Sequence, residues 1–516
     1  IAGLIAIPIL SFSGVAGWFY VQSLPAKNII VLVADFDGPD PKTYRVTEAV
    51  NRQLHQATEK YADVEIQSLN KSITEQEGSK VAWTEGEKRK ATIVIWGWYS
   101  NPGNVALLSA HFEVLHPPKY LPELKQNARG NIQQAAIADL KSFTLQTRLS
   151  TEMNYLSLFT LGMTRFAAGD QAGAIARFSD ALNQKTDSSS SLNQSLVYFY
   201  RGIGYLQKGE YNLALADFTQ TIKLHHNFAE AYNNRGLIYL TTGKYDQAIT
   251  DFNQTIKLQP DRAFAYFNRS SVYFFKKDYD HSLVDLNQVI KLQPDFALAY
   301  VKRGSTYHFK GDFDRAITDF NQAIKLQPNS ASLYEIRGEV YIKRGDFDRA
   351  LADINQGIKL QPNSASVYVM RGALYREKGD YDRAFADLDR AFKLKPDDAQ
   401  NYNARGWTYA QKGDFDRALV DLDRALKLKP DIENFYDSRG FAYAGKHDYS
   451  RAIADYNQAL KLQPDADYVY LHRGIVYRAL GDRPQAIADF KKTLELTKNS
   501  KRHQDAEKQL QELGAK

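Results

Sequence analysis

Apolar and small side chains recur along most of the chain with a period of 34 residues. Taking Ala229–Arg262 as one unit with positions 1 to 34, tyrosine stands at positions 4 and 11 in nine successive units. Position 8 is glycine in eight of these units and Ser270 in the ninth. Because positions 4, 8 and 11 fall on one stripe of a helix, each unit is predicted to begin with a helix that buries this stripe.

A turn and a second helix follow within each unit. Gly311 stands where a helix C-terminus needs a left-handed residue, and Asp312 comes next, where it can cap the following helix. That helix is predicted to bury Ala316 and Phe320 and to end before Pro328, whose ring prevents continuation. The pattern therefore predicts a stack of helical hairpins instead of one globular core. The closing prolines, each 34 residues after the last, are Pro260, Pro294, Pro328, Pro362, Pro396, Pro430 and Pro464.

These positions resemble the tetratricopeptide repeat (TPR) signature. Tyrosine replaces the usual tryptophan at position 4, and Arg235 and its equivalents replace leucine at position 7. The resemblance covers nine in-phase units in residues 195–500, and an earlier, divergent unit lies in residues 151–188. It implies a mainly α fold, a right-handed TPR α-solenoid of ten repeats. The residues that carry the resemblance in one unit are Tyr232, Gly236, Tyr239, Ala248, Phe252 and Pro260.

Charged residues also follow the period. Arginine at position 7 and aspartate at position 23 recur together in all nine in-phase units, as Arg303 with Asp319. We expect the two to pair across helices, because a guanidinium beside a buried stripe needs a partner. The alternative is a set of independent, solvated charges. After the last unit, residues 501–516 place Ala506 and Leu510 on one face, as a capping helix would.

The first 23 residues are predicted to form a transmembrane helix. Residues 1–21 carry no charge, and about 20 apolar residues match the hydrocarbon thickness of a bilayer. A cleaved signal peptide and a buried core helix are the alternatives. The following flank lacks a basic excess, which favours an extracytoplasmic body on a single-pass membrane protein. The chain begins at Ile1 instead of Met, so we expect residues upstream of it.

Residues 28–117 alternate strand and helix patterns in the order β-α-β-α-β-β. They predict a small α/β domain, of two or three layers, in front of the solenoid. Its element order and the strand exit at residues 34–38 resemble the N-terminal domain of TolB-like envelope proteins, which implies a non-catalytic assembly module. Residues 118–150 are predicted to be a connector, with a helix at 132–140 and a strand at 142–149.

The amino-acid composition excludes several classes of function and supports few. The 516 residues carry a net charge of +6 from 66 basic and 60 acidic residues, which indicates a mixed, solvated surface without a nucleic-acid-binding motif. Without cysteine, the chain has no disulfide, thiolate metal site or cysteine nucleophile.

Candidate chemistry in the α/β region is sparse. Asp35, Asp37 and Asp40 follow a strand, where ligands often bind in α/β folds, but Val46 occupies the glutamate position of a calcium loop. No glycine-rich phosphate loop is present. We therefore expect no enzyme activity, metal, cofactor or small-molecule substrate within these residues.

A protein or peptide partner is expected on the first helices. In the TPR family these helices line a concave face, and positions 2, 5, 9, 12 and 13 point into its groove. In this chain those positions vary, and aromatic side chains gather at some of them. Packing against a neighbouring helix is the alternative for each. The predicted partner-binding residues are Phe264, Phe267, Phe274, Phe275, His308 and Phe309, with Trp407 and Phe441 in a second cluster.

The sequence thus predicts a membrane-anchored TPR scaffold that binds a peptide or protein segment on its concave face. No position 9 is asparagine, so the clamp by which chaperone-binding relatives hold a C-terminal carboxylate is absent. The alternative function is the regulatory or sensory arm of a larger enzyme, a kinase or NTPase encoded upstream of Ile1.

Overall fold

The computed structural model describes residues 29–38, 45–59, 64–100, 107–115, 142–148, 153–183, 191–497 and 500–515. The predicted transmembrane segment at residues 1–23 lies outside these ranges, as does most of the predicted connector. Within the described ranges, no helix combines the length and the apolar character needed to cross a bilayer. The chain divides after Leu326 into two compact units, called here the N-terminal unit and the C-terminal unit.

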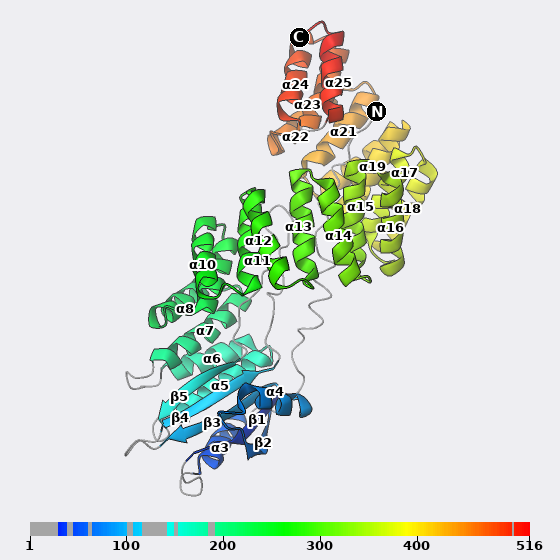
Figure 1. The fold of residues 1–516 in the computed structure, drawn as a ribbon. Helices are drawn as coiled ribbons and strands as arrows, with labels where there is room; N and C mark the ends of the chain where they lie inside the picture. Colours follow the sequence, from blue (N-terminus) through cyan, green and yellow to red (C-terminus); the bar gives the residue numbers. More distant parts are fainter. Residues whose placement is uncertain are drawn as a thin grey trace. The chain divides into compact units, whose positions relative to one another are not determined.

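A five-stranded sheet opens the N-terminal unit (Figure 1). Its strand order is β2-β1-β3-β4-β5; β1 runs parallel to β2 and β3, and the last two strands join antiparallel. The fifth strand lies in the predicted connector, so the sheet extends beyond residue 117. The strands are β1 (Ile29–Asp35), β2 (Val64–Ser72), β3 (Ile93–Ser100), β4 (Leu107–Val114) and β5 (Ser142–Arg148).

Helices cover both faces of the sheet. On one face α4 (Gly78–Lys88) packs Ala82 against Leu32 and Val94. The other face is covered by α3 (Val46–Thr58) and by α5 (Met153–Ala167), the first helix of the divergent repeat. The domain is therefore a three-layer sandwich, and a repeat helix supplies part of one layer.

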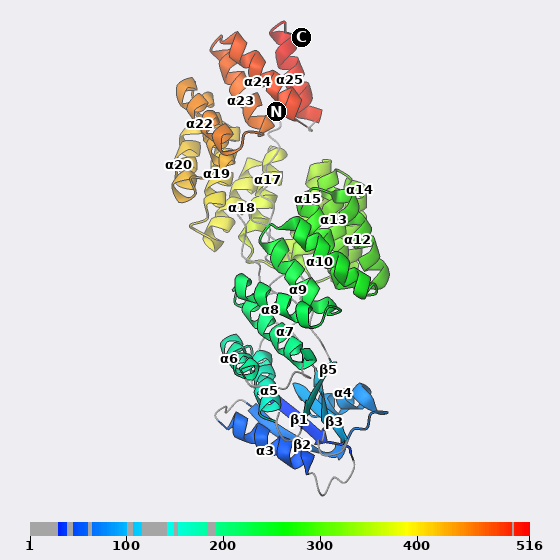
Figure 2. The same ribbon diagram turned by 90° about the vertical axis from the view of Figure 1, so that its left-hand side faces the viewer.

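The core runs without a break from the sheet into the repeats. Phe112 of β4 meets Phe159 of α5 edge to face at 5.5 Å, and Phe159 lies 5.7 Å from Phe178 of the next helix. Figures 1 and 2 show α5 against the sheet, with the later hairpins following it. The remaining helices of this unit are α6 (Gln171–Leu182), α7 (Ser191–Gln207), α8 (Tyr211–Leu224), α9 (Ala229–Thr241), α10 (Tyr245–Leu258), α11 (Ala263–Phe275), α12 (Tyr279–Leu292), α13 (Ala297–Lys310) and α14 (Phe313–Leu326).

The C-terminal unit consists of helical hairpins and a closing helix. In α25, Ala506 and Leu510 are buried against Leu471 and Phe490, as expected of a cap. Its helices are α15 (Ala331–Arg344), α16 (Phe347–Leu360), α17 (Ala365–Glu377), α18 (Tyr381–Leu394), α19 (Ala399–Lys412), α20 (Phe415–Leu428), α21 (Glu433–Gly445), α22 (Tyr449–Leu462), α23 (Asp467–Ala479), α24 (Arg483–Leu496) and α25 (Ser500–Glu512).

Glycine at position 8 allows close packing inside most of the hairpins. A Cβ atom on Gly236 would lie 2.9 Å from the ring of Phe252, which is closer than side-chain contacts allow. The turns also form as predicted: Gly311 adopts φ 86°, and the Asp312 carboxylate accepts a hydrogen bond from the Arg315 backbone N–H at 3.1 Å. Sequence and structure thus agree on how each hairpin is built.

Candidate protein-interaction site

Three of the recurring first-helix positions are committed to packing. Arg303 donates from Nη2 to Asp319 Oδ1 at 2.6 Å and from Nε to Oδ2 at 2.8 Å, which confirms the predicted pairing between the two helices of one unit. Its third contact, from Nη1 to Asn287 Oδ1 at 2.7 Å, reaches the preceding unit, and its guanidinium lies 5.6 Å from the Tyr300 ring centre. Tyr307 at position 11 lies with its ring centre 4.6 Å from the Arg315 guanidinium of the same hairpin, so positions 4, 7 and 11 all take part in packing.

The bidentate pair recurs beyond this one unit. Arginine and aspartate at positions 7 and 23 bond in the same way in all nine in-phase units. First helices of neighbouring units also touch one another, as α19 does with α17 and α21. The variable positions of these helices remain as the candidate surface for a partner.

An aromatic patch lies at the C-terminal ends of α11 and α13. Phe274 meets Phe309 edge to face at 5.2 Å, and Tyr279, the first residue of α12, lies 5.7 Å from Phe274. Phe309 is 41% exposed, and His308 is 5.5 Å from it. The structure thus brings three of the predicted residues together, on a surface that retains exposed aromatic area.

The other predicted residues of this cluster have different surroundings. Phe267 is 1% exposed and packs 5.3 Å from Phe296, so its ring belongs to the core, a correction to its assignment as a partner-binding residue. Phe275 stacks on Tyr245 of the preceding unit at 6.1 Å, which links two hairpins. Phe264 lies ten residues before Phe274 in α11, about 15 Å along the helix, and so stands apart from the patch.

The second predicted cluster also forms. The rings of Trp407 in α19 and Phe441 in α21 lie 4.8 Å apart, and both side chains are half-buried. His472 of α23 lies 5.9 Å from Phe441 and shares a hydrogen bond of 2.8 Å with Asp437 through Nδ1. Burial lowers the pKa of His472, but attraction and the hydrogen bond to Asp437 outweigh this and raise it.

A lysine that sequence reasoning missed sits near the first cluster. Lys302 of α13 bonds to Ser271 Oγ and lies 4.1 Å from the ring centre of Phe267. Burial lowers its pKa to about 7. It is the only lysine at position 6 among the nine in-phase repeats, and this difference from the other repeats could have drawn attention to it in the sequence.

Two glutamates on α15 were missed as well. Glu335 is 8% exposed and Glu339 half-buried, and burial raises the pKa of each to about 7. Attraction to Lys343 partly opposes the shift at Glu339. They are the only glutamates at positions 5 and 9 of the nine units, a difference from the other repeats that the sequence alone displays.

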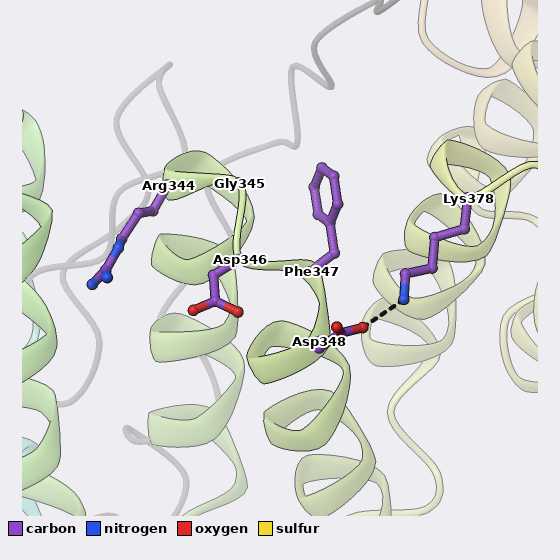
Figure 3. Close-up of a pocket in the computed structure, with 6 residues that line it drawn as sticks. All are labelled: Arg344, Gly345, Asp346, Phe347, Asp348 and Lys378. Atoms are coloured by element: carbon purple, nitrogen blue, oxygen red, sulfur yellow. Dashed lines mark hydrogen bonds and ion pairs between the residues drawn. The ribbon is translucent and has the colours of Figure 1, made fainter.

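A surface pocket lies at the turn between α15 and α16 (Figure 3). Its walls include Asp348, whose carboxylate pairs with Lys378 at 2.6 Å, while Arg344 points away from that pair. The same lysine–aspartate link recurs between other neighbouring units, for example Lys276 with Asp246 at 2.6 Å. The pocket is therefore part of the repeated turn structure.

The strand-exit aspartates of the α/β domain take part in backbone structure. Asp37 donates its N–H to Gly97 O at 3.0 Å, and its carbonyl accepts from Tyr99 N at 2.9 Å. Asp40 lies outside the described residues. In the part of the chain that the structure describes, no group of three or more histidine, aspartate or glutamate side chains could hold a metal ion.

This architecture defines a class of protein: a solenoid of two-helix hairpins, typically a non-catalytic scaffold for protein–protein interaction. The chain belongs to the tetratricopeptide repeat family. Models described as "Tetratricopeptide repeat" match residues 229–262, 265–296, 301–365 and 372–436, and one described as "TPR repeat" matches residues 202–243 and 446–481.

Solved structures of other proteins resemble parts of this chain at low sequence identity. A tetratricopeptide repeat protein from Parabacteroides merdae is 21% identical over 47% of this chain and 93% of its own, with a TM-score of 0.39. Yeast Tom70 is 15% identical over 71% of this chain and 96% of its own, also with a TM-score of 0.39. YrrB, titled a TPR protein with an unusual peptide-binding site, is 20% identical over 36% of this chain and 97% of its own, with a TM-score of 0.32. The search of curated proteins found no match.

Proposed function

We propose that this TPR scaffold binds an extended peptide or protein segment along the faces of its first helices. One observation carries the proposal: the invariant positions of these helices are used in packing, while the variable positions keep partly exposed aromatic pairs. Phe274 with Phe309 and Trp407 with Phe441 are the two pairs. Aromatic side chains of this kind provide most of the binding energy at many protein interfaces.

The test is a selection of binding sequences from a random peptide library with the purified full chain. Wild-type protein is expected to enrich a restricted set of sequences. A variant with Trp407→Ala and Phe441→Ala, and a second with Phe274→Ala and Phe309→Ala, should each lose at least part of that set while keeping the helical circular dichroism of the wild type. Identical enrichment by wild type and both variants would contradict the proposal.

We also propose that residues 1–23 anchor the scaffold in a membrane. The support is their uncharged, apolar composition, with a length that matches a bilayer. Expression with and without these residues, followed by carbonate extraction of the membranes, tests the anchor. Complete extraction of the chain that retains them would overturn it.

A further inference from the structure

Glu335 and Glu339 occupy one face of α15, the first helix of the C-terminal unit. They are positions 5 and 9 of their repeat, so their side chains lie one helical turn apart on the same face. No other first helix in the C-terminal unit has acidic residues at both position 5 and position 9 of its repeat. In α17, for comparison, the equivalent residues are Val369 and Ala373.

The stem of Glu335 is packed inside the hairpin stack. A Cβ atom on Gly357 of α16 would lie 3.4 Å from Glu335 Cγ, and Glu335 is 8% exposed. Position 27 of the 34-residue repeat is glycine only in the repeat that begins with α15, and it carries a larger residue in the other eight in-phase repeats. The hairpin thus accommodates a glutamate stem at position 5, where the one other acidic residue among the nine repeats, Asp437, has His472 as its hydrogen-bond partner.

Within the described ranges, neither carboxyl group has a hydrogen bond or ion pair of its own. Burying a carboxylate without a partner costs several kcal/mol, and two ionised groups one turn apart repel each other. Glu339 has the attraction of Lys343 as compensation, and Glu335 has desolvation alone acting on its pKa. A buried polar group without a partner in a native protein calls for an explanation, and an external group that completes the pairing is one such explanation.

Among the described residues, Lys343 attracts Glu339, and no basic group is resolved as attracting Glu335. Lys343 lies one turn beyond Glu339 and attracts it, while Arg502 of α25 acts on Lys343. Burial raises the pKa of both glutamates to about 7. A cation placed beside them would lower these pKa values and favour the charged carboxylates.

A basic side chain suits this pair better than a metal ion. Calcium requires six or more oxygen ligands, and no third acidic or histidine side chain joins the pair among the described residues. A guanidinium or ammonium group, in contrast, forms strong charge-assisted hydrogen bonds with one or two carboxylates.

We propose that the first-helix face of the C-terminal unit binds a partner segment through a lysine or arginine side chain, whose cation lies against the carboxyl groups of Glu335 and Glu339. The inference rests on the proposed function and specifies its partner: an extended segment with a basic residue. Charge complementarity at α15 selects that residue.

The experiment repeats the peptide-library selection with three forms of the full chain. These are the wild type, a Glu335→Gln and Glu339→Gln double variant, and a control with Asp431→Asn and Asp465→Asn. The control also removes two carboxylates, but from exposed loops of the C-terminal unit. Wild type and control should enrich arginine or lysine at one position of the selected peptides, and the glutamine variant should lose that enrichment.

A selected peptide is then compared with its citrulline analogue, which replaces arginine by a neutral group of the same shape. Fluorescence anisotropy of the labelled peptides should show about tenfold weaker binding of the citrulline form to wild type, or 1.4 kcal/mol, and little difference for the glutamine variant. Unchanged arginine preference in the glutamine variant, or selection of neutral peptides by wild type, would overturn the inference while leaving the proposed function intact. If wild type selects no peptides, both proposals fail.

Discussion

At position 7 of each in-phase repeat, one guanidinium serves several neighbours at once. Arg303 bonds twice to Asp319 in its own hairpin and once to Asn287 in the preceding hairpin. The aspartate is 4% exposed, so the pair is removed from most solvent screening. These contacts explain how arginine can stand at position 7, where the family usually has leucine.

Replacing Arg303 by alanine should destabilise the fold by about 2 kcal/mol or more, because Asp319 would stay buried without its partner. Urea unfolding followed by circular dichroism measures the change. The matched control is Arg315→Ala, because the Arg315 side chain is 63% exposed and pairs with Asp312 at the surface. That control should leave the urea midpoint nearly unchanged, and equal effects of the two substitutions would contradict the assigned role of position 7.

Glu335 gives a pH dependence with a defined sign. Burial raises its pKa from 4.5 to about 7, so the folded chain holds this proton over a pH range in which the unfolded chain has released it. The contribution of Glu335 to stability is therefore greatest below pH 4.5 and falls as the pH rises towards 7. When the pH reaches the pKa of the folded state, the loss of folding stability approaches about 3 kcal/mol.

The Glu335→Gln variant should therefore gain stability relative to wild type between pH 5 and pH 8. Urea unfolding of both forms at the two pH values measures the difference. Asp465→Asn, in an exposed loop, should show no such pH-dependent gain. A constant difference between wild type and Glu335→Gln at the two pH values would show that the glutamate is not held protonated by burial.

Among structural elements, α11 and α13 show that aromatic residues on successive first helices can have separate roles. Phe267 is enclosed by its own hairpin and Phe296, whereas Phe309 keeps 41% of its surface exposed. Phe267→Ala should cost about 3 kcal/mol or more. Phe309→Ala should cost less than about 1 kcal/mol and weaken peptide binding. Thermal unfolding and peptide anisotropy on the two variants separate the roles, and a reversed order of stability loss would refute the assignment.

The periodic elements could be predicted from the sequence because each depends on local spacing. Tyrosine, glycine and tyrosine at positions 4, 8 and 11, the capping aspartates and the closing prolines all act within one hairpin. Helix bounds and the Arg303–Asp319 pair followed from them. The burial of Phe267 could not be predicted in this way, because it depends on how the next hairpin places Phe296.

The candidate site was harder to predict for a related reason. Trp407 and Phe441 share position 9 in consecutive units, and stacking of the units brings them together. Lys302, Glu335 and Glu339 are single departures from the repeat, and a search for aromatic residues passes over them. The membrane segment, the TolB-like resemblance and the role of the aromatic residues in binding remain predictions.

On the scale of the whole chain, the α/β domain and the first repeat share one core. Phe159 of α5 contacts Phe112 of the sheet and Phe178 of α6. The continuous core implies that the domain and the first hairpins of the N-terminal unit are stabilised together instead of forming beads on a linker.

Phe159→Ala should therefore raise hydrogen exchange both in β1 and β4 and in α5 to α7, because a cavity at this junction weakens both sides. Exchange measured by mass spectrometry on the full chain gives both regions at once. The control is Phe435→Ala, fully buried in the C-terminal unit, which should leave exchange of the sheet unchanged. Exchange raised by Phe159→Ala on only one side of the junction would contradict the shared core.

Photo-crosslinking in cells tests most directly whether the first-helix faces bind the partner. A photoreactive amino acid is placed at Ser305 or Ile475, both at position 9 of first helices, and at Val284 or Val420, which are 64% and 71% exposed on second helices. We predict partner adducts at the first-helix positions and few or none at the second-helix positions. Equal adducts at both sets, or adducts only at Val284 and Val420, would contradict the account.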